Sequence, residues 1–467
     1  MSFTSIDIST LPPPLVEVCE RICVSHKHAT SWLVGGCVRD LMLGMPPKDF
    51  DLEVYNVPAE LLRETLENIG KVEFVGKQFG VFKLWYKEIE IDVALPRTER
   101  KTARGHSGFM VDSDPSLSPE IASLRRDFTI NAMMLNPLTG QMHDFHGGKK
   151  DLQNKKLRHV SKAFSEDPLR PLRAMQFAAR FGFSLHDESV DLCRELIAEA
   201  AYLPPERIWT EWQKWSCAPY PSYGLQLLID SGWISLYPEL QAIVDCPQDP
   251  HWHPEGDVWT HTLQCCDQAS AIASKNNLLA VVRQRLVFAA LCHDYGKPSV
   301  NTTGHQGRIR SPGHSEAGIK PAQSFLNGIG APLSLLDYVE PLVREHITHL
   351  HGEATERAVR RLAHRLEPAN IELWEMLVEA DASGRAPAPP SRPALEWLHK
   401  AVQLQNHQNR PHPILTGKLM LKMGAQPGIL MGKILKSAYE AQLDGCIYDK
   451  QSAIAWYQKQ RKNNQGN

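Results

Sequence analysis

Alternation of apolar and polar residues marks roughly the first 150 residues, whereas helical spacing dominates the rest of the chain. Five stretches are rich in β-branched and apolar residues, as strands are: SWLVGG, DFDLEVY, VEFVG, VFKLWY and EIDVAL. Between them, PAELLRETLENIG places Leu61, Leu62 and Leu66 at helical spacing. The pattern predicts an α+β fold, in which a mixed β-sheet head is followed by all-α regions from about residue 151.

The length of 467 residues predicts several domains. Two proline-rich breaks, DCPQDPHWHPEGD and GRAPAPPSRP, are typical of joints between domains. The segment 100–124 is rich in Gly, Ser and charge without periodicity, which predicts a mobile surface loop. We expect a head at 1–150, a helical neck at 151–235, a third domain at 236–390 and a helical tail at 391–467.

Composition narrows the class of protein. Hydrophobic residues make up 42% and charged residues 22% of the chain, and no run of 18 or more apolar residues predicts a membrane span. The N-terminus lacks the basic and apolar regions of a signal peptide. Ten cysteines without a CxxC pair indicate reduced thiols, so we expect a cytoplasmic protein. A net charge of -2 does not decide for or against nucleic-acid binding.

Chemistry-bearing residues gather near residue 40. Gly35 and Gly36 follow a short apolar strand and precede a helical run, a turn that lets backbone approach a phosphate, with Arg39 one turn further on. Alone, this pattern also fits a tight turn with a surface arginine. Asp49 and Asp51 then share one face of a predicted strand, about 6.6 Å apart, and two carboxylates that close need a cation. Together these features favour two-metal nucleotidyl transfer with Mg²⁺.

Three long motifs carry a family resemblance: LVGGCVRDLMLGMPPKDFDLEV, SLRRDFTINAMML and EDPLRPLRAMQFAARFGF. In order and spacing they resemble the class II tRNA nucleotidyltransferases, which are the CCA-adding enzymes, and the related bacterial poly(A) polymerases. The resemblance implies a polymerase-beta-like head in which Asp49 and Asp51 are the catalytic, Mg²⁺-binding residues. It implies nucleotide binding by Gly36, Arg39, Arg126, Asp127, Asp167, Arg170 and Arg173.

Three further positions in these motifs need separate interpretation. Asn131 is a candidate for holding the site together, although an Asn at a helix start is as often a local partner of the backbone. Asp92 is a third acidic residue, which we leave off the catalytic list because the family does not keep an acid there reliably. Many relatives have an arginine where this chain has Gln176, and a neutral amide gives no charge-assisted bond to a triphosphate.

A base-selecting device is predicted around EDPLR. Helical spacing places Asp167, Arg170 and Arg173 along one face, which by itself also fits a surface ion pair. Cytosine and adenine both present an amino donor beside a ring-nitrogen acceptor, so a carboxylate beside a guanidinium suits these bases and leaves polar groups unpaired against uracil or guanine. In the family this motif acts as an amino-acid template.

A second metal site is predicted between residues 258 and 385. His293 and Asp294 close an apolar helix, where a charged pair is costly unless it is liganded. With His261 and Asp381, and with His314 and His346 as further candidates, the set resembles an HD phosphohydrolase domain. Such mixed ligands suit Mn, Ni, Fe or Zn. The resemblance implies a phosphatase or 2',3'-cyclic phosphodiesterase, and Lys297 is either a phosphate ligand or a helix-end cation.

The tail sequence resembles the tail of many bacterial CCA-adding enzymes. Four of its lysines could bind RNA phosphates or simply be solvated surface residues: Lys418, Lys422, Lys433 and Lys436. The chain is thus expected to add CCA to tRNA from CTP and ATP, as a monomer or homodimer, with no membrane and no DNA partner. Restricted addition (CC, A or poly(A)) and a main role as HD hydrolase stay open. A non-catalytic RNA-binding role is disfavoured, because every expected carboxylate is present.

Overall fold

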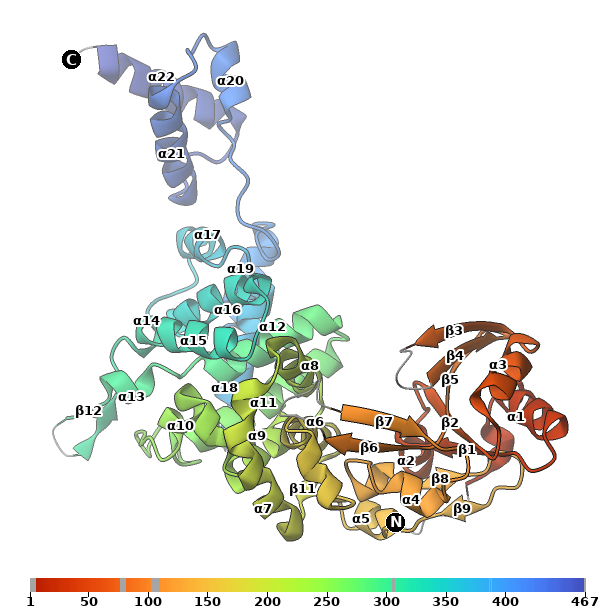
Figure 1. Cartoon of the computed structure of the whole chain (residues 1–467). Helices are drawn as coiled ribbons and strands as arrows, with labels where there is room; N and C mark the ends of the chain where they lie inside the picture. Colours follow the sequence, from red (N-terminus) through yellow and green to blue (C-terminus); the bar gives the residue numbers. More distant parts are fainter. Residues whose placement is uncertain are drawn as a thin grey trace. The chain divides into compact units, whose positions relative to one another are not determined.

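The computed structural model describes residues 6–75, 81–101, 109–304, 307–385, 387 and 389–465. The chain forms two compact units. The first comprises Met1–Trp215 and Tyr223–Leu236, and the second comprises Ser216–Ser222 and Tyr237–Asn467. The first therefore combines the predicted head with most of the predicted neck, while the boundaries expected at residues 150 and 390 stay predictions. Figure 1 shows the elements coloured along the sequence, from red at the N-terminus to blue at the C-terminus.

A seven-stranded mixed sheet forms the core of the first unit, in the order β3-β4-β5-β2-β1-β8-β9. Its strands β2 and β5 are parallel, and the other neighbouring strands are antiparallel. Helix α1 packs on β1, β5 and α3, and Figure 1 shows α1 and α3 side by side against the sheet. The strands are β1 Thr30–Val34, β2 Phe50–Tyr55, β3 Lys71–Val75, β4 Val81–Tyr86, β5 Ile89–Ala94, β8 Met134–Leu135 and β9 Met142–His143.

Part of the predicted surface loop is a second, two-stranded sheet. Strand β6 (Arg97–Lys101) pairs with β7 (Phe109–Ser113), and α4 (Pro119–Ser123) follows. The expectation of an irregular loop over 100–124 is therefore wrong for these parts, because backbone pairing with β7 forms β6 although RTERK has no apolar alternation; residues 102–108 lie outside the described residues. The other helices of the head are α1 Pro13–Ser25, α2 Gly36–Met42, α3 Ala59–Glu67 and α5 Gly148–Gln153.

Helices dominate the remainder of the first unit, as predicted, apart from the two-residue strands β10 (Lys156–Leu157) and β11 (Ser184–Leu185). Helix α6 ends at Gly182, whose φ of 67° is a left-handed cap that glycine adopts at low cost. A Cβ at Gly224 would lie 2.7 Å from the carbonyl oxygen of Met175, so glycine permits this close helix contact. The helices are α6 Arg170–Phe181, α7 Asp187–Glu195, α8 Pro205–Ser216 and α9 Pro221–Asp230.

The second unit is built on a helical core in which α11 packs on α12 and α18, and α12 packs on α16. The large buried side chains Phe288, Phe325 and Trp374 fill this core. The short strands β12 (Thr302–Thr303) and β13 (Ile309–Arg310) form its one strand pair among the described residues. The helices are α10 Pro238–Ile243, α11 Val258–Lys275, α12 Ala280–Cys292, α13 Lys297–Val300, α14 His314–Ala317, α15 Ile319–Gly328, α16 Leu333–Glu345, α17 Glu356–Arg365, α18 Ile371–Ser383 and α19 Leu395–Gln403.

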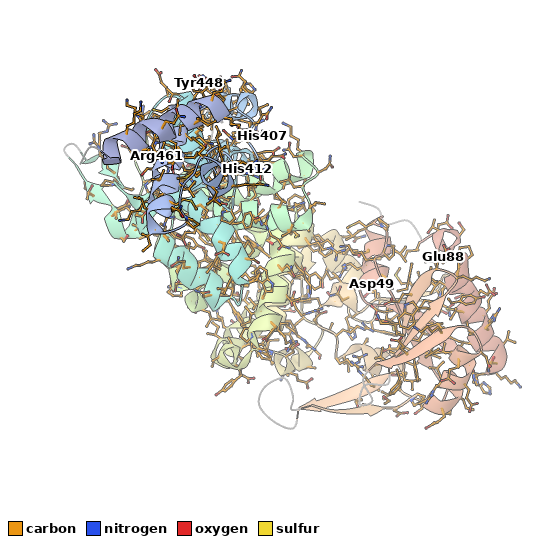
Figure 2. The ribbon with its side chains drawn as sticks, turned by 90° about the horizontal axis from the view of Figure 1, so that it is seen from above. Asp49, Glu88, His407, His412, Tyr448 and Arg461 are labelled. Carbon is orange, nitrogen blue, oxygen red and sulfur yellow. The ribbon has the colours of Figure 1, made fainter. Side chains whose placement is uncertain are left out.

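Three C-terminal helices have a small core of their own. They are α20 Gly417–Lys422, α21 Ile429–Leu443 and α22 Lys450–Gln465, and they bury Met420, Ala438 and Tyr457. Arg357 and Arg361 of α17 donate from Nε to Asp444 Oδ1, which follows α21, over 2.7 and 2.8 Å. Figure 2 labels the exposed Tyr448 of this tail. Across the described residues, no helix combines the length and the apolar character that crossing a membrane requires.

Candidate functional site

The first unit places a glycine turn directly beside Asp51. Strand β1 ends at Val34, and Gly35, with φ of 75°, leads into α2. A Cβ at Gly35 would lie 3.1 Å from Arg126 Nη1 and 3.3 Å from Asp51 Oδ2. Glycine therefore lets the turn approach both side chains, as expected of a turn at this place. Gly36 is the first residue of α2.

Three carboxylates interact at this point. Asp49 is exposed and lies in the bend before β2, so the prediction that it belongs to the strand is wrong (Figure 2). Asp92 on β5 stands in register with Asp51 on β2. Burial raises the pKa of Asp51, Arg126 opposes this, and the charges of Asp92 and Asp49 raise the pKa further. A divalent cation would relieve this crowding of negative charge, so the residues present fit Mg²⁺.

A buried network links the second motif to the first. Arg39 Nη1 donates to Asn131 Oδ1 over 2.5 Å, and Asn131 Nδ2 donates to Asp127 Oδ1 over 2.9 Å. Arg173 donates from Nε and Nη2 to Asp127 Oδ2 over 2.9 and 2.7 Å. Burial opposes the charge of Asp127, but Arg173 and Asn131 outweigh it and lower the pKa to about 2. Asn131 thus holds side chains together, and the alternative of a purely local backbone role is wrong.

The position of Gln176 has a cationic neighbour. Gln176 is buried in α6, and Arg180 lies one turn further along the same helix. Arg180 Nη2 is 2.9 Å from Asp40 Oδ2, while Arg39 donates to Asp40 Oδ1 from Nε and Nη2 over 2.9 and 2.7 Å. Gln176, Arg39 and Arg180 line the same cavity. A guanidinium is therefore present one turn from the position where the expected arginine is missing.

Asp167 and Arg170 do not share a helical face, contrary to the prediction. Asp167 is in extended conformation before α6, which begins at Arg170. The residue before a proline is disfavoured in helical conformation, and Pro168 follows Asp167. Arg207 of α8 donates from Nη1 and Nη2 to Asp167 Oδ1 and Oδ2 over 3.2 and 2.9 Å and, against the effect of burial, lowers the pKa of Asp167. Arg170 instead donates to the carbonyls of Ala163 and Arg125 over 2.6 and 2.7 Å.

One open cavity of about 470 Å³ gathers these groups. Asp51 lines it, whereas Asp49 does not. Every predicted nucleotide-binding residue also lines it, namely Gly36, Arg39, Arg126, Asp127, Asp167, Arg170 and Arg173. Sequence reasoning missed four further cations of the lining: Arg125, Arg180, Arg207 and Lys214. Their only signal was basic character on amphipathic helices or beside a motif, which most surface residues share. The cavity combines many guanidinium groups with few carboxylates.

The second unit brings four imidazoles together, and three of them are oriented in the same way. His293 Nδ1 contacts the carbonyl of Ala290 at 2.7 Å, His314 Nδ1 that of Ser311 at 2.8 Å, and His346 Nδ1 that of Val343 at 2.7 Å. A carbonyl only accepts, so each Nδ1 carries the proton and each Nε2 presents a lone pair. His293 and His346 cap the C-terminal ends of α12 and α16.

Two of these lone pairs face each other. The Nε2 atoms of His314 and His346 are 3.1 Å apart. Burial, with His293 and His314, lowers the pKa of His346 to about 3, so its ring is neutral at ordinary pH. His293 Nε2 is buried without a hydrogen-bond partner, and Asp294 Oδ2, which pairs with Lys297, lies 3.2 Å from it. Facing lone pairs and an unpartnered buried acceptor favour a cation, so the site fits a divalent metal ion.

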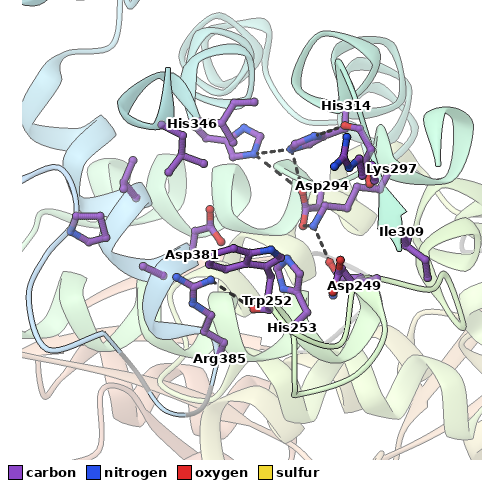
Figure 3. Close-up of a pocket in the computed structure, with 18 of the residues that line it drawn as sticks. Asp249, Trp252, His253, Asp294, Lys297, Ile309, His314, His346, Asp381 and Arg385 are labelled. Carbon is purple, nitrogen blue, oxygen red and sulfur yellow. Dashed lines mark hydrogen bonds and ion pairs between the residues drawn. The ribbon is translucent and has the colours of Figure 1, made fainter. Parts of the chain in front are cut away.

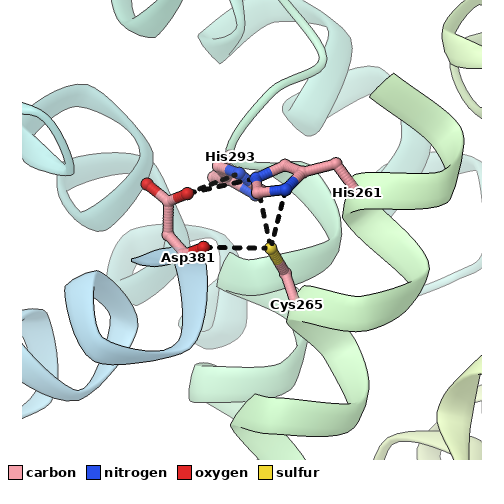
Figure 4. A group of neighbouring side chains, drawn as sticks. All are labelled: His261, Cys265, His293 and Asp381. Carbon is pink, nitrogen blue, oxygen red and sulfur yellow. Dashed lines mark hydrogen bonds and ion pairs between the residues drawn. The ribbon is translucent and has the colours of Figure 1, made fainter. Parts of the chain in front are cut away.

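Among the described residues, two of three groups of potential ligands together contain the predicted residues. The first, drawn in Figure 4, is His261, Cys265, His293 and Asp381, and the second is Asp294, His314 and His346; within each group the ligand atoms lie within 4.8 Å of one another. All six predicted residues are thus brought together. Cys265, whose Sγ is 3.3 Å from His261 Nε2, was missed. Lys297 Nζ is 2.6 Å from both Asp294 Oδ2 and Gln248 Oε1, so it is an ion-paired, buried cation.

Glu255 orients the fourth imidazole. Its Oε1 lies 2.8 Å from His261 Nδ1 and 2.9 Å from His253 Nδ1, and its side chain is 1% exposed. A carboxylate behind a ligating histidine fixes the ring so that the other nitrogen faces the metal. The segment DCPQDPHWHPEGD, predicted as a joint between domains, supplies Glu255 to this centre and Trp252 and His253 to the pocket above it. The run of His and Glu was the overlooked signal.

Comparison with known proteins identifies three matched regions. Residues 31–158 match the poly A polymerase head domain, 182–243 the probable RNA and SrmB-binding site of polymerase A, and 258–382 the HD domain. The chain is 37% identical over 386 residues to the multifunctional CCA protein of Xanthomonas campestris, covering 79% of this chain and 90% of that protein. It is 38% identical over 367 residues to the multifunctional CCA protein of Actinobacillus pleuropneumoniae, covering 76% and 85%.

Solved structures share the fold. The CCA-adding enzyme of Bacillus stearothermophilus in complex with CTP has a TM-score of 0.66 at 18% identity, covering 98% of this chain and all of the other. The CCA-adding enzyme of Thermotoga maritima complexed with tRNA has a TM-score of 0.60 at 16% identity, covering 96% of each chain. The identities to curated relatives and the matched regions show that the chain belongs to the family of the multifunctional CCA proteins, whose members join a nucleotidyltransferase head to an HD domain.

Proposed function

We propose that this chain adds CCA to the 3' end of tRNA from CTP and ATP. The observation that carries the proposal is the cavity of the first unit, where Asp51 faces Arg126 across the Gly35 turn and further guanidinium groups line the wall. Cations placed this way suit a triphosphate, because guanidinium groups bind phosphate oxygens through paired hydrogen bonds. The names of the relatives support the same activity.

Asp51 and Asp49 are proposed to hold the magnesium ions, with Asp92 close enough to assist. Bound Mg²⁺ supplies activation of the attacking 3'-hydroxyl and stabilisation of the leaving pyrophosphate. Arg126 balances the charge of Asp51 before substrate arrives. The network from Arg39 through Asn131 and Asp127 to Arg173 fixes part of the cavity wall, since each member is hydrogen-bonded and all but the half-buried Arg173 are buried.

Base choice is proposed to depend on Asp167 together with Arg170 and Arg207. Arg207 holds the Asp167 carboxylate, while the Arg170 guanidinium is fixed by two carbonyls. A fixed acceptor beside fixed donors matches the amino group and ring nitrogen of cytosine and adenine, and leaves a polar group unpaired against uracil or guanine. The orientation of the Asp167 carboxylate therefore depends on Arg207, which is forty positions further along the chain.

The decisive experiment offers tRNAs that end before CCA, after the first C and after CC to the purified protein with each labelled nucleotide. Product lengths of three, two and one added residues establish CCA addition. Arrest after CC, addition of A alone, or long A tails would replace the proposal with one of the restricted activities. No incorporation with any tRNA and Mg²⁺ would refute nucleotidyl transfer.

We propose a metal-dependent phosphohydrolase activity for the HD domain, on phosphate esters such as RNA-end 2',3'-cyclic phosphates. The facing Nε2 atoms of His314 and His346 and the unpartnered His293 Nε2 support it. Imidazole with carboxylate favours Mn, Ni or a similar ion over Mg²⁺. When bound, such an ion supplies an activated water. Hydrolysis of a cyclic phosphate with added Mn²⁺ or Ni²⁺ tests the proposal, and absence of turnover with each ion would make the domain structural.

The tail is proposed to contact the tRNA. Lys418, Lys422, Lys433 and Lys436 are exposed, and within the described residues no acidic side chain forms an ion pair with them. Unpaired surface lysines supply the salt-dependent part of RNA binding. Replacement of all four by glutamine should weaken tRNA binding and flatten its dependence on salt, as measured by filter binding.

A further inference from the structure

The cavity above the HD metal centre has two chemically distinct parts. It has a volume of about 510 Å³, and its base carries Asp294, His314, His346 and Asp381 (Figure 3). The rest of its wall combines apolar side chains with polar and charged ones, which are Gln248, Asp249, His253, Lys297, Arg310, Ser311, His349 and Arg385. The apolar lining is Trp252, Ile309, Ile347, Leu350, Val378 and Pro393. A metal centre needs only the base, so the apolar part is available to a larger group on the substrate.

Trp252 is the distinctive residue of this wall. All eleven tryptophans of the chain lie in the described part, and Trp252, at 55% exposure, is the only one of them that is exposed. Single exposed apolar residues are ordinary on a protein surface. This one, however, faces a cavity that ends at a cluster of metal-ligand side chains (Figure 3).

Its backbone is held in place on both sides. The Trp252 N–H donates to the carbonyl of Asp249 over 3.1 Å, and Arg385 Nη1 donates to the Trp252 carbonyl over 3.4 Å. The ring of His251 stands at 81° to the indole, with ring centroids 5.0 Å apart. The indole is therefore supported by its neighbours while much of its surface stays open. A supported, open aromatic face is what stacking of a flat ring requires.

We propose that Trp252 is a specificity-determining residue on which the base of a terminal nucleotide stacks, with Arg385 beside it and the phosphate reaching the metal centre. The proposal rests on the phosphohydrolase function proposed above. It predicts that the preferred substrates carry a nucleobase. It also explains why the segment 245–257 belongs to the centre: Trp252 and Glu255 come from the same turn, so one loop both orients His261 and meets the base.

The test compares two esters in the metal-loaded, full-length protein: adenosine 2'-monophosphate and the base-free glycerol 2-phosphate. Stacking on an aromatic residue is worth a few kcal/mol, so Trp252→Ala should raise KM for the nucleotide roughly 5- to 100-fold and leave kcat within about twofold. KM for glycerol 2-phosphate should not change. Trp252→Phe should restore most of the nucleotide affinity. Tyr448→Ala, which removes an exposed aromatic ring of the tail, is the matched control and should change neither ester.

Equal effects of Trp252→Ala on both esters would show a structural role and overturn the proposal, as would no effect on either. If the wild-type protein hydrolyses neither ester, the phosphohydrolase function is what fails. Equilibrium dialysis of labelled adenosine 2'-monophosphate then decides the remaining point: weaker binding by Trp252→Ala than by Trp252→Phe supports stacking, and equal binding by the two variants refutes it.

Discussion

The two sites of this chain hold charge in opposite ways. The cavity of the first unit is lined by ionised groups that balance one another, such as Arg173 against Asp127. The HD centre is instead built on four histidines. The Nδ1 atoms of three donate to carbonyls three residues earlier in the chain, and that of His261 faces Glu255. The first arrangement suits a large, charged substrate that replaces internal ion pairs. The second arrangement fixes the lone pairs of imidazole nitrogens toward a metal ion. Metal binding there should therefore depend less on long-range charge.

The largest expected effect separates the two chemistries. Asp51→Asn should lower nucleotide addition by about a thousandfold or more, because a metal contributes several kcal/mol to such a transition state. The variant should fold as well as the wild type, since burial and neighbouring acids already raise the pKa of Asp51. Incorporation of labelled CTP is the measurement. Hydrolysis by the HD domain should be unchanged, and a joint loss of both activities would contradict independent sites.

His293→Ala should remove the HD activity and leave nucleotide addition intact. Loss of a buried Nε2 ligand should abolish phosphohydrolysis and lower the amount of Mn²⁺ or Ni²⁺ retained after gel filtration, measured by elemental analysis. CCA addition should stay within about twofold. His351→Ala, at an exposed histidine, is the control. Full metal retention by the His293 variant would remove it from the ligand set.

Glu255→Gln should weaken metal binding about 10- to 100-fold, because partners behind a ligating histidine contribute that much. The amide would no longer enforce the proton position on His261 Nδ1. Titration calorimetry with Ni²⁺ measures the effect without turnover. Glu316→Gln, at an exposed acid, should bind as the wild type does. An unchanged affinity in the Glu255 variant would show that the helix alone orients His261.

Asp127→Asn tests how far the first site depends on charge. The folded-state pKa of Asp127, about 2, lies below the value near 4 of an unfolded chain, so its stabilisation is present above pH about 4 and is lost as the pH falls toward 2. The variant should lose about 2 kcal/mol in the free energy of unfolding at pH 7 and roughly half as much at pH 3. Urea midpoints at both pH values measure this, with the exposed Asp187→Asn as control. A loss that does not depend on pH would point to packing instead.

The smallest effect concerns base choice. Arg207→Met removes the ion partner of Asp167 and should lower the preference for CTP over UTP by roughly tenfold, since the carboxylate then loses its fixed direction. The ratio of kcat/KM for the two nucleotides is the measurement. Arg194→Met, at an exposed arginine of α7, is the control. A preserved ratio with lowered turnover would limit Arg207 to phosphate binding.

Sequence patterns predicted five strands of the head, β1 to β5, and many of the residues that line the two sites, because alternation and motif residues are local properties. They failed where the answer depended on another segment. The Asp167 carboxylate meets Arg207 rather than Arg170, since a proline keeps Asp167 out of the helix. Glu255 and Trp252 lie in a stretch that was interpreted as a joint between domains because it contains three prolines. Asp92 reaches Asp51 only through the register of two parallel strands that are far apart in sequence.

Two helices of the HD domain, α12 and α16, end at His293 and His346, two of the proposed metal ligands. The carboxyl end of a helix carries partial negative charge from its aligned peptide dipoles. Two such ends at one centre attract cations through the main chain, and side-chain substitutions do not remove this attraction. Loss of a single ligand should therefore lower metal occupancy without abolishing it. The remaining affinity comes from the backbone.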